Sequence, residues 1–394
     1  MTTDILSLNF PGLSKDAAMF WYRVDSFVRY GISRIPVSPN LGFRPLSHYL
    51  DYFNYVISII GIVCNVFHLI VLTRKPMRAL TINIFLISIG ICDLGRMLSI
   101  LTIFTPQYYL HFQQKVVPGT CISPMYFLTM VLIEIGTATF KLTQEVSVWL
   151  GVTMAILRAL VIKYPLNQRI HSYIDSQYGI RLLFLVTFPI LPFWYFHFWQ
   201  LTIHEIGPWT PPANCTGYST NYSQILYMFY VTDATSIFGE TIQKIILLTE
   251  GILFRLIPSI ILPVATIILI YEIKKAKKIS LSKREESNDK STKLVSFFTI
   301  SFLIATAPIG MLYLVEFFVY DIVGLMNLID LFSDVFSVLS SINGTIHFLI
   351  CFFMSSQYRS TARNLFGLEK IFRSSPHLMT QSGTSAKCLK SSKA

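Results

Sequence analysis

The sequence predicts an all-α membrane protein. We expect a bundle of seven transmembrane helices with the N-terminus outside, the C-terminus in the cytosol, and a short amphipathic interfacial helix after the seventh span. Hydrophobic residues make up 53% of the 394 residues and charged residues only 13%, about half the charged fraction of a typical soluble domain. Seven apolar segments are long enough to cross a bilayer, and Lys and Arg gather in alternate connections between them. This composition excludes a soluble enzyme and a disordered chain.

The seven segments are identified by length and by scarcity of charge. A spanning helix needs roughly 20 apolar residues. Four segments contain no Asp, Glu, Lys or Arg, and the other three contain a few. The segment from Cys121 to residue 132 is expected to be a loop or a projecting helix, because one straight helix over 121–163 would be about 64 Å long. In chain order, the predicted spans are residues 52–73, 80–104, 133–163, 182–204, 245–271, 294–315 and 335–358.

The orientation follows from the basic residues. One set of connections and the C-terminal tail hold 21 Lys and Arg, whereas the opposing inter-helix loops hold only Lys115 and Lys244. Basic loops stay on the cytosolic side, so the N-terminus is placed outside. The five basic residues of the N-terminal tail are an exception, but long tails translocate with less regard to charge. The chain then divides into an extracellular tail (1–49), the bundle (50–357), and a cytosolic amphipathic helix with a disordered tail (358–394).

The cytosolic end predicts membrane and protein partners. The net charge of +11 lies mostly on the inner face, where it meets anionic lipid headgroups and acidic partner surfaces, so nucleic acid is not a predicted partner. Residues 359–372 mix basic and apolar side chains, a pattern typical of an interfacial helix. From Ser374 the tail is rich in Ser and Thr, and phosphorylation there would recruit an arrestin-like partner.

Two cysteines and two sequons lie in the predicted outer segments. Of the six cysteines, only Cys121 and Cys215 face the oxidising side. We therefore predict a disulfide between them, the alternative being two free thiols. Asn214 and Asn221 begin glycosylation sequons, and Asn221 is the better acceptor because Asn214 adjoins the disulfide. The sequon at Asn343 should stay unmodified, since it is predicted within the membrane.

Motifs in four spans point to a receptor family. They are Gly61-Ile-Val-Cys-Asn65 in the first span, a segment ending at Asp93 in the second, a Ser-Val-Trp-Leu run from Ser147 preceding Arg158 in the third, and a segment from Asn343 to Arg359 in the seventh. Together they resemble rhodopsin-like G-protein-coupled receptors over about residues 50–366. The resemblance is closest to the nematode serpentine receptor class W and to FMRFamide- and myosuppressin-type peptide receptors.

The resemblance implies a plasma-membrane receptor that binds an extracellular ligand and activates a heterotrimeric G protein through Arg158. Three motifs depart from the family pattern. The acid before Arg158 is replaced by Leu157, and the Tyr after it by Ala159. The sixth span lacks the family's Trp before Pro308. The seventh span has His347 in place of the Asn of the family's Asn-Pro-x-x-Tyr motif, and it also lacks the Pro and the Tyr.

Ionisable residues within the spans give two candidate sites. Asp93, with Asn65, Asn343 and His347, is predicted to form a polar switch centre that could hold a sodium ion; the alternative is a protonated Asp93 acting as static glue. Lys141 and Glu145 share one helix face, either as a neutralising pair or as a mixed-charge ligand pocket. An acidic, water-facing rim is a further candidate for ligand binding, because it would attract a cationic ligand. Its residues are Glu316, Asp330 and Asp334.

The favoured function is a receptor for a short FMRFamide-like neuropeptide. The first alternative is a chemosensory receptor for a small environmental molecule, which would use the Phe- and Tyr-rich interior. The second is an ion channel or transporter. No catalytic motif is present in the sequence, so neither an enzymatic activity nor a cofactor is predicted.

Overall fold

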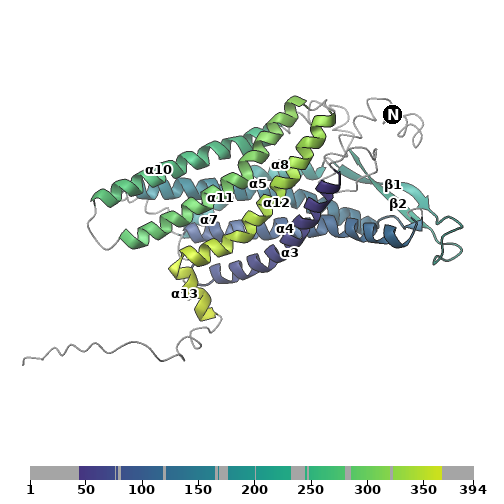
Figure 1. Ribbon diagram of the computed structural model, residues 1–394, viewed down its shortest axis with the longest axis horizontal. Helices are drawn as coiled ribbons and strands as arrows, with labels where there is room; N and C mark the ends of the chain where they lie inside the picture. The colour runs from purple at the N-terminus through teal and green to yellow at the C-terminus, as the bar shows by residue number, and fades with distance from the viewer. Residues whose placement is uncertain are drawn as a thin grey trace, which may run out of the picture.

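Long helices run side by side through most of the computed structural model, and a β-hairpin projects beyond one end (Figure 1). The structure describes residues 44–365, apart from 76, 79–80, 119–120, 165–166, 168–175, 200, 232–244, 246–247, 280–284 and 320–322. The predicted N-terminal tail before residue 44 and the C-terminal segment after residue 365 therefore lie outside the described residues.

The helices of the described residues agree with the predicted spans in order and approximate place. Six of them are long and apolar enough to cross a membrane, and α11 carries a shorter apolar stretch over Ile300–Glu316. In chain order, the helical elements of the described residues are α3 (Arg44–Leu72), α4 (Thr81–Val116), α5 (Phe127–Lys163), α7 (Ser176–Thr187) with η2 (Phe188–Ile190) and α8 (Leu191–Trp199), π-helical η3 (Glu250–Leu256) with α10 (Ile257–Ile279), α11 (Glu285–Val319), α12 (Val323–Met354) and α13 (Ser356–Leu365).

Helix ends differ from the apolar segments because hydropathy marks the membrane and not the helix. The first helix begins at Arg44, inside the segment assigned to the extracellular tail, and α4 continues twelve residues past the predicted end at Phe104. Residues 122–126 are not helical and α5 begins at Phe127, so the expected loop before the third span is present. The Phe188–Ile190 turn includes Pro189, which has no N–H for the helical hydrogen-bond ladder.

One β-hairpin corrects the all-α prediction. Strand β1 (Leu201–Trp209) pairs antiparallel with β2 (Gln224–Val231). The predicted fourth span ran to residue 204 and was wrong at this end, because an uncharged apolar run does not distinguish helix from strand. The register shifts between Glu205 and Gly207, where Gly207 has a φ of +146°. Glycine tolerates this backbone conformation, which is typical of a β-bulge.

Small residues and polar contacts join the helices. Apolar surface gives little drive for helix association in lipid, so close packing and interhelical hydrogen bonds matter more. Gly310 of α11 lies against Arg255 of η3, where an added Cβ would be 2.6 Å from the Arg255 Cβ. Asn54 Nδ2 donates to Ser337 Oγ at 3.2 Å and so joins α3 to α12. These contacts bring the polar side chains of different spans into the bundle.

Candidate functional site

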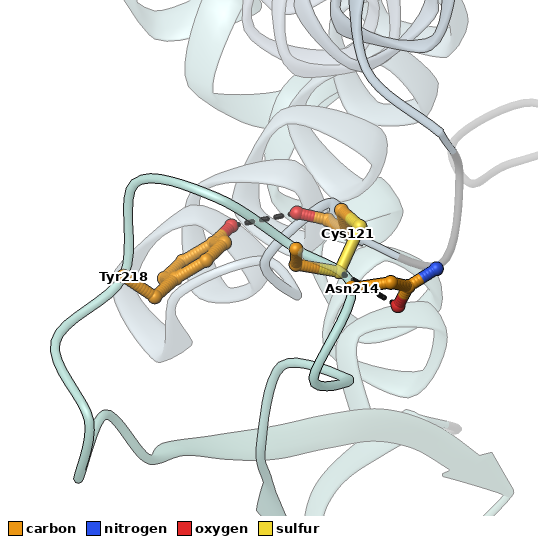
Figure 2. Close-up of a disulfide and its surroundings, with 4 residues drawn as sticks. Cys121, Asn214 and Tyr218 are labelled. Carbon is orange, nitrogen blue, oxygen red and sulfur yellow. Dashed lines mark hydrogen bonds between the residues drawn. A yellow bond between two sulfur atoms is a disulfide. The ribbon is translucent and has the colours of Figure 1, made fainter.

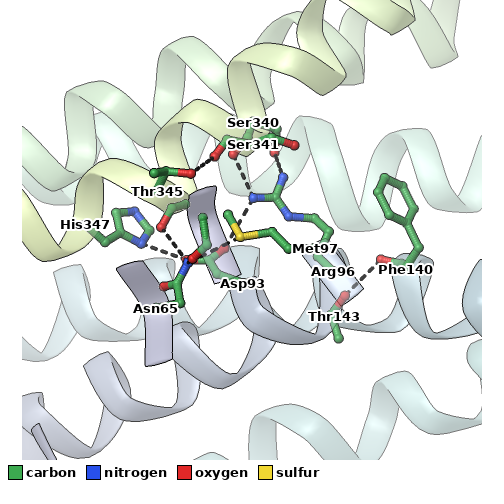
Figure 3. A network of polar contacts seen from close by, with 12 residues as sticks. Asn65, Asp93, Arg96, Met97, Phe140, Thr143, Ser340, Ser341, Thr345 and His347 are labelled. Carbon is green, nitrogen blue, oxygen red and sulfur yellow. Dashed lines mark hydrogen bonds and ion pairs between the residues drawn. The ribbon is translucent and has the colours of Figure 1, made fainter. Parts of the chain in front are cut away.

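Asp93 of α4 is the centre of a buried polar group (Figure 3). Asp93 is 4% exposed, and each of its carboxylate oxygens faces a nitrogen atom of a neighbouring side chain. His347 Nδ1 lies 2.8 Å from Oδ2, and Arg96 Nη2 lies 3.4 Å from Oδ1. The structure therefore brings together Asp93 and His347, two of the four residues predicted for the polar switch centre. Burial of this carboxylate is tolerable because charged or polar donors face both of its oxygens.

Arg96 is the member of this group that the sequence analysis did not single out. It is 4% exposed and also reaches α12, where Nη1 donates to the Ser340 hydroxyl and Nη2 donates to the Ser340 carbonyl at 2.7 Å. A signal was present in the sequence. Asp93 and Arg96 are three residues apart inside one apolar span, a spacing that places opposite charges on one helix face.

The two predicted asparagines take different positions. Asn65 is buried, and its Nδ2 contacts the Gly61 carbonyl at 3.0 Å, the Gly344 carbonyl at 3.2 Å and the Met97 sulfur at 3.4 Å. It therefore contacts α12 through the backbone. Asn343 is also buried, but its Oδ1 has no hydrogen-bond partner among the described residues. Asn65 thus ties α3 to the polar centre, whereas no described contact joins Asn343 to Asp93.

The groups around Asp93 do not fit the sodium ion considered for this site. Hard cations are bound by oxygen ligands, but the groups facing the two oxygens of Asp93 are a guanidinium and an imidazole nitrogen. Arg96 carries a permanent positive charge, which would repel a second cation. In the described part of the chain, no three His, Cys, Asp or Glu side chains are grouped as metal ligands.

A second charged group lies between α5 and the π-helical segment η3. Lys141 Nζ is 3.1 Å from Glu250 Oε2, and both side chains are nearly buried. Glu145, one helical turn after Lys141, is 2% exposed and lies within electrostatic range of Lys141, Glu250 and Arg255. The expected mixed-charge set is therefore present, and it includes two residues that the sequence analysis did not assign to it, Glu250 and Arg255.

The π-helix explains why Glu250 and Arg255 are both buried. Five residues separate them, a spacing that would place them on different faces of an α-helix. The segment instead closes its hydrogen bonds over five residues, as the Ile257 N–H to Ile252 carbonyl bond shows. This register turns both charged side chains into the bundle, where each is at most 5% exposed. π-Helical turns are frequent at functional sites.

The acidic rim is less open than predicted. Glu316 of α11 and Asp330 and Asp334 of α12 are all half-buried, which corrects the prediction of a water-facing rim. Glu316 lies within electrostatic range of Asp330, Lys141 and Glu250, and the Asp334 carboxylate accepts a hydrogen bond from Ser47 of α3. The helices turn these carboxylates toward their neighbours, so part of the rim continues into the buried charged group.

The end of the bundle that carries the hairpin also carries the predicted disulfide. Cys121 and Cys215 are bonded, with their Cα atoms 5.4 Å apart. Beside the bridge, the Tyr218 hydroxyl donates to the Cys121 carbonyl at 2.7 Å (Figure 2). The sequon residues Asn214 and Asn221 are both exposed on this loop. The loop is therefore held to the start of the third span, with both predicted acceptors accessible.

The opposite end carries Arg158 and α13. Arg158 is half-buried near the end of α5, within electrostatic range of Cys351 on α12. Tyr358 of α13 is fully buried, and its hydroxyl lies 3.0 Å from His68 Nδ1 on α3. Burial raises the pKa of the Tyr358 phenol, so it stays protonated at neutral pH. α13 begins three residues before the predicted amphipathic segment, and residues 366–372 of that segment lie outside the described residues.

Comparison with known proteins gives one family match. The family model described as "Serpentine type 7TM GPCR chemoreceptor Srw" matches residues 52–369, which is most of the chain. Those residues include both buried charged groups, the disulfide and Arg158. No curated protein matches the chain.

Proposed function

This chain belongs to the serpentine 7TM GPCR chemoreceptor family Srw, and on that premise we propose that it is a plasma-membrane receptor that couples an extracellular ligand to a heterotrimeric G protein. Family membership and the apolar helices make it a multi-pass membrane protein of a receptor family. We extend this to seven spans, with α11 as the sixth, and to an extracellular N-terminus. The positive-inside distribution of Lys and Arg supports this orientation.

The positions of the two ends support the same orientation. The disulfide and the exposed sequon residues lie at the hairpin end, as expected of an oxidising, glycosylating compartment. The helix α13 lies at the other end (Figure 1), and Arg158 lies near the C-terminal end of α5. We place α13 at the cytosolic membrane surface, where its Arg359 and Arg363 would face lipid headgroups.

For the ligand, we propose a short peptide that carries a cationic group, as in FMRFamide-like neuropeptides. The observation that carries this proposal is the excess of acid around Lys141. Among the described residues, the electrostatic contacts of Glu145 and Glu316 join four carboxylates to two cations, Lys141 and Arg255. An excess of acidic side chains attracts and orients a cationic ligand. The carboxylates are those of Glu145, Glu250, Glu316 and Asp330.

A small environmental molecule is the second candidate, favoured by the description of the family as chemoreceptors. The same charged group would then recognise an amine. Neither candidate needs a channel or transporter activity, and a receptor family gives that alternative no support.

We propose that ligand binding competes with the Lys141–Glu250 pair. A ligand cation beside Glu250 would displace the Lys141 ammonium, which links α5 to η3 at 3.1 Å. Breaking such a link lets the two helices shift relative to each other. Arg158, near the cytosolic end of α5, would then contact the C-terminus of the G protein. Arrestin recruitment by the phosphorylated tail belongs to the same proposal and concerns residues outside the described range.

The ligand proposal is tested in cells with a calcium or cyclic-nucleotide reporter. Amidated peptides that contain Arg beside an aromatic residue are compared with peptides in which citrulline, a neutral analogue, replaces Arg. The receptor variants are Glu250→Gln and, as a matched control on the exposed hairpin, Glu205→Gln. We expect Glu250→Gln to reduce potency for the Arg peptide at least tenfold, with little effect of Glu205→Gln and little further loss for the citrulline peptide.

Equal loss for both peptides would contradict a charge contact at Glu250. If only small molecules activate the receptor, the peptide proposal is wrong and the chemosensory candidate stands. The G-protein step is tested separately with Arg158→Ala, which should keep ligand binding and lose reporter output. Unchanged signalling by Arg158→Ala would show that this receptor couples through another surface.

A further inference from the structure

We propose that Arg96 is a built-in cation for Asp93, which makes the polar centre independent of sodium and holds α12 against α4. The proposal concerns the resting bundle and does not depend on the identity of the ligand. The nitrogen groups that face Asp93 differ from the oxygen ligands of the sodium ion that was predicted for the polar switch centre.

The carboxylate of Asp93 needs a counter-charge because it is almost fully buried in a membrane-spanning helix. An uncompensated charge inside a bilayer is costly. Arg96 Nη2 provides a counter-charge 3.4 Å from Oδ1, and His347 Nδ1 faces Oδ2 at 2.8 Å. Arg96 is covalently attached one turn along the same helix, so its local concentration does not depend on the ions in solution.

The guanidinium is shared between two helices. While one side faces Asp93, Nη1 donates to the Ser340 hydroxyl and Nη2 donates to the Ser340 carbonyl at 2.7 Å (Figure 3). A guanidinium presents several donors in a fixed plane, and so can contact a carboxylate on α4 and a serine on α12 at the same time. A bound sodium ion could leave during a conformational change, whereas Arg96 can only exchange partners.

Gly344 shows how closely α12 approaches this pair. A Cβ added at Gly344 would lie 2.6 Å from Arg96 Nη2 and 2.9 Å from Asp93 Cγ. The carbonyl of the same glycine accepts the hydrogen bond from Asn65 of α3 at 3.2 Å. Three helices therefore meet at the Asp93–Arg96 pair. The guanidinium therefore lies beside the carboxylate on the side that faces α12.

The first test measures the thermal stability of the purified full-length receptor in detergent. Tm is compared in sodium chloride and in choline chloride at equal ionic strength. We expect the same Tm in both salts, because Arg96 already neutralises Asp93. A higher Tm in sodium would overturn the proposal, and this measurement needs no variant.

The second test is a double-mutant cycle with Arg96→Met and Asp93→Asn, using Lys115→Met at the exposed end of α4 as the control for loss of a cation. Arg96→Met should lower Tm by several degrees, because it removes the guanidinium that faces Oδ1 of the buried carboxylate and, among the described residues, leaves only His347 paired with it. In the Asp93→Asn background, the same substitution should lower Tm much less. Equal losses in the two backgrounds would show that Arg96 only fills space, and would refute its role as counter-ion.

Discussion

Replacing Gly344 with Ala tests how tightly α12 packs on the polar centre. The new Cβ would lie 2.6 Å from Arg96 Nη2 and 2.9 Å from Asp93 Cγ. Both distances are shorter, by roughly 0.9 Å and 0.6 Å, than ordinary van der Waals contact of about 3.5 Å. Arg96 cannot swing away without releasing Ser340, and Asp93 cannot move without releasing His347. The substitution therefore strains contacts on two helices.

The magnitude follows from two opposing effects. Overpacking of a well-packed site costs typically about 1–3 kcal/mol, whereas Gly→Ala in a helix gains roughly 0.5–1 kcal/mol. Gly151→Ala is the matched control, because its new Cβ would be 3.7 Å from the nearest atoms, on Phe302, an ordinary contact. We expect Gly151→Ala to be neutral or stabilising and Gly344→Ala to be destabilising by about 1–2 kcal/mol after the helical gain is subtracted.

The assay is thermal unfolding of the purified receptor, with the two variants compared side by side. Equal stability of Gly344→Ala and Gly151→Ala would refute the reasoning, because it would mean that α12 does not lie against the Asp93–Arg96 pair. The control also separates this packing effect from a general response of transmembrane helices to alanine.

Three further predictions concern the two ends of the bundle. Cys215→Ser should reduce surface delivery, measured by labelling intact cells, because the loop loses its bond to the third span. Alkylation of both Cys121 and Cys215 in the wild type without reductant would contradict the bridge. A glycosidase-sensitive mass shift should be lost in Asn221→Gln and kept in Asn343→Gln, and the reverse result would overturn the proposed topology. Tyr358→Phe should lower the free energy of unfolding by about 1–3 kcal/mol, because buried His68 Nδ1 loses its hydrogen-bond partner at 3.0 Å. An unchanged Tm would show that this hydrogen bond contributes nothing to stability.

The long helices could be predicted because the bilayer imposes two simple requirements. A span needs an uninterrupted apolar length and backbone groups that are satisfied within the segment, and both leave a plain pattern in the sequence. The disulfide was predictable for a related reason, since the orientation left only Cys121 and Cys215 on the oxidising side. Both predictions depend on whether a residue lies in the membrane, outside the cell or in the cytosol, and the distribution of apolar and basic residues indicates this.

The hairpin was not predicted because hydropathy alone cannot tell whether an apolar run forms a helix or a strand. Residues 201–204 contain no Asp, Glu, Lys or Arg and extend the fourth apolar segment, but they form the start of β1. Strand β2 is rich in aromatic and β-branched residues (Gln224–Val231), which favour a strand. A search for β-propensity after the fourth span would have found it.

The partners of the buried charges were harder to predict because they depend on helix register. Asp93 and Arg96 share a face in any α-helix, so their pairing could have been foreseen. Glu250 and Arg255 share a face only because η3 is π-helical, and hydropathy and charge spacing do not predict a π-helix. From the sequence, the nearest candidate partner of Lys141 was Glu145, one turn along the same helix. In the structure, Lys141 instead forms an ion pair with Glu250 on η3.

The two charged groups are close enough to influence each other. Arg96 lies within electrostatic range of Arg255, and Arg255 lies within range of Glu145. A cationic ligand bound beside Glu145 would add positive charge to this set, and the net repulsion that acts on Arg96 would increase. Electrostatics would therefore couple a cationic ligand to the contact between Arg96 and Ser340.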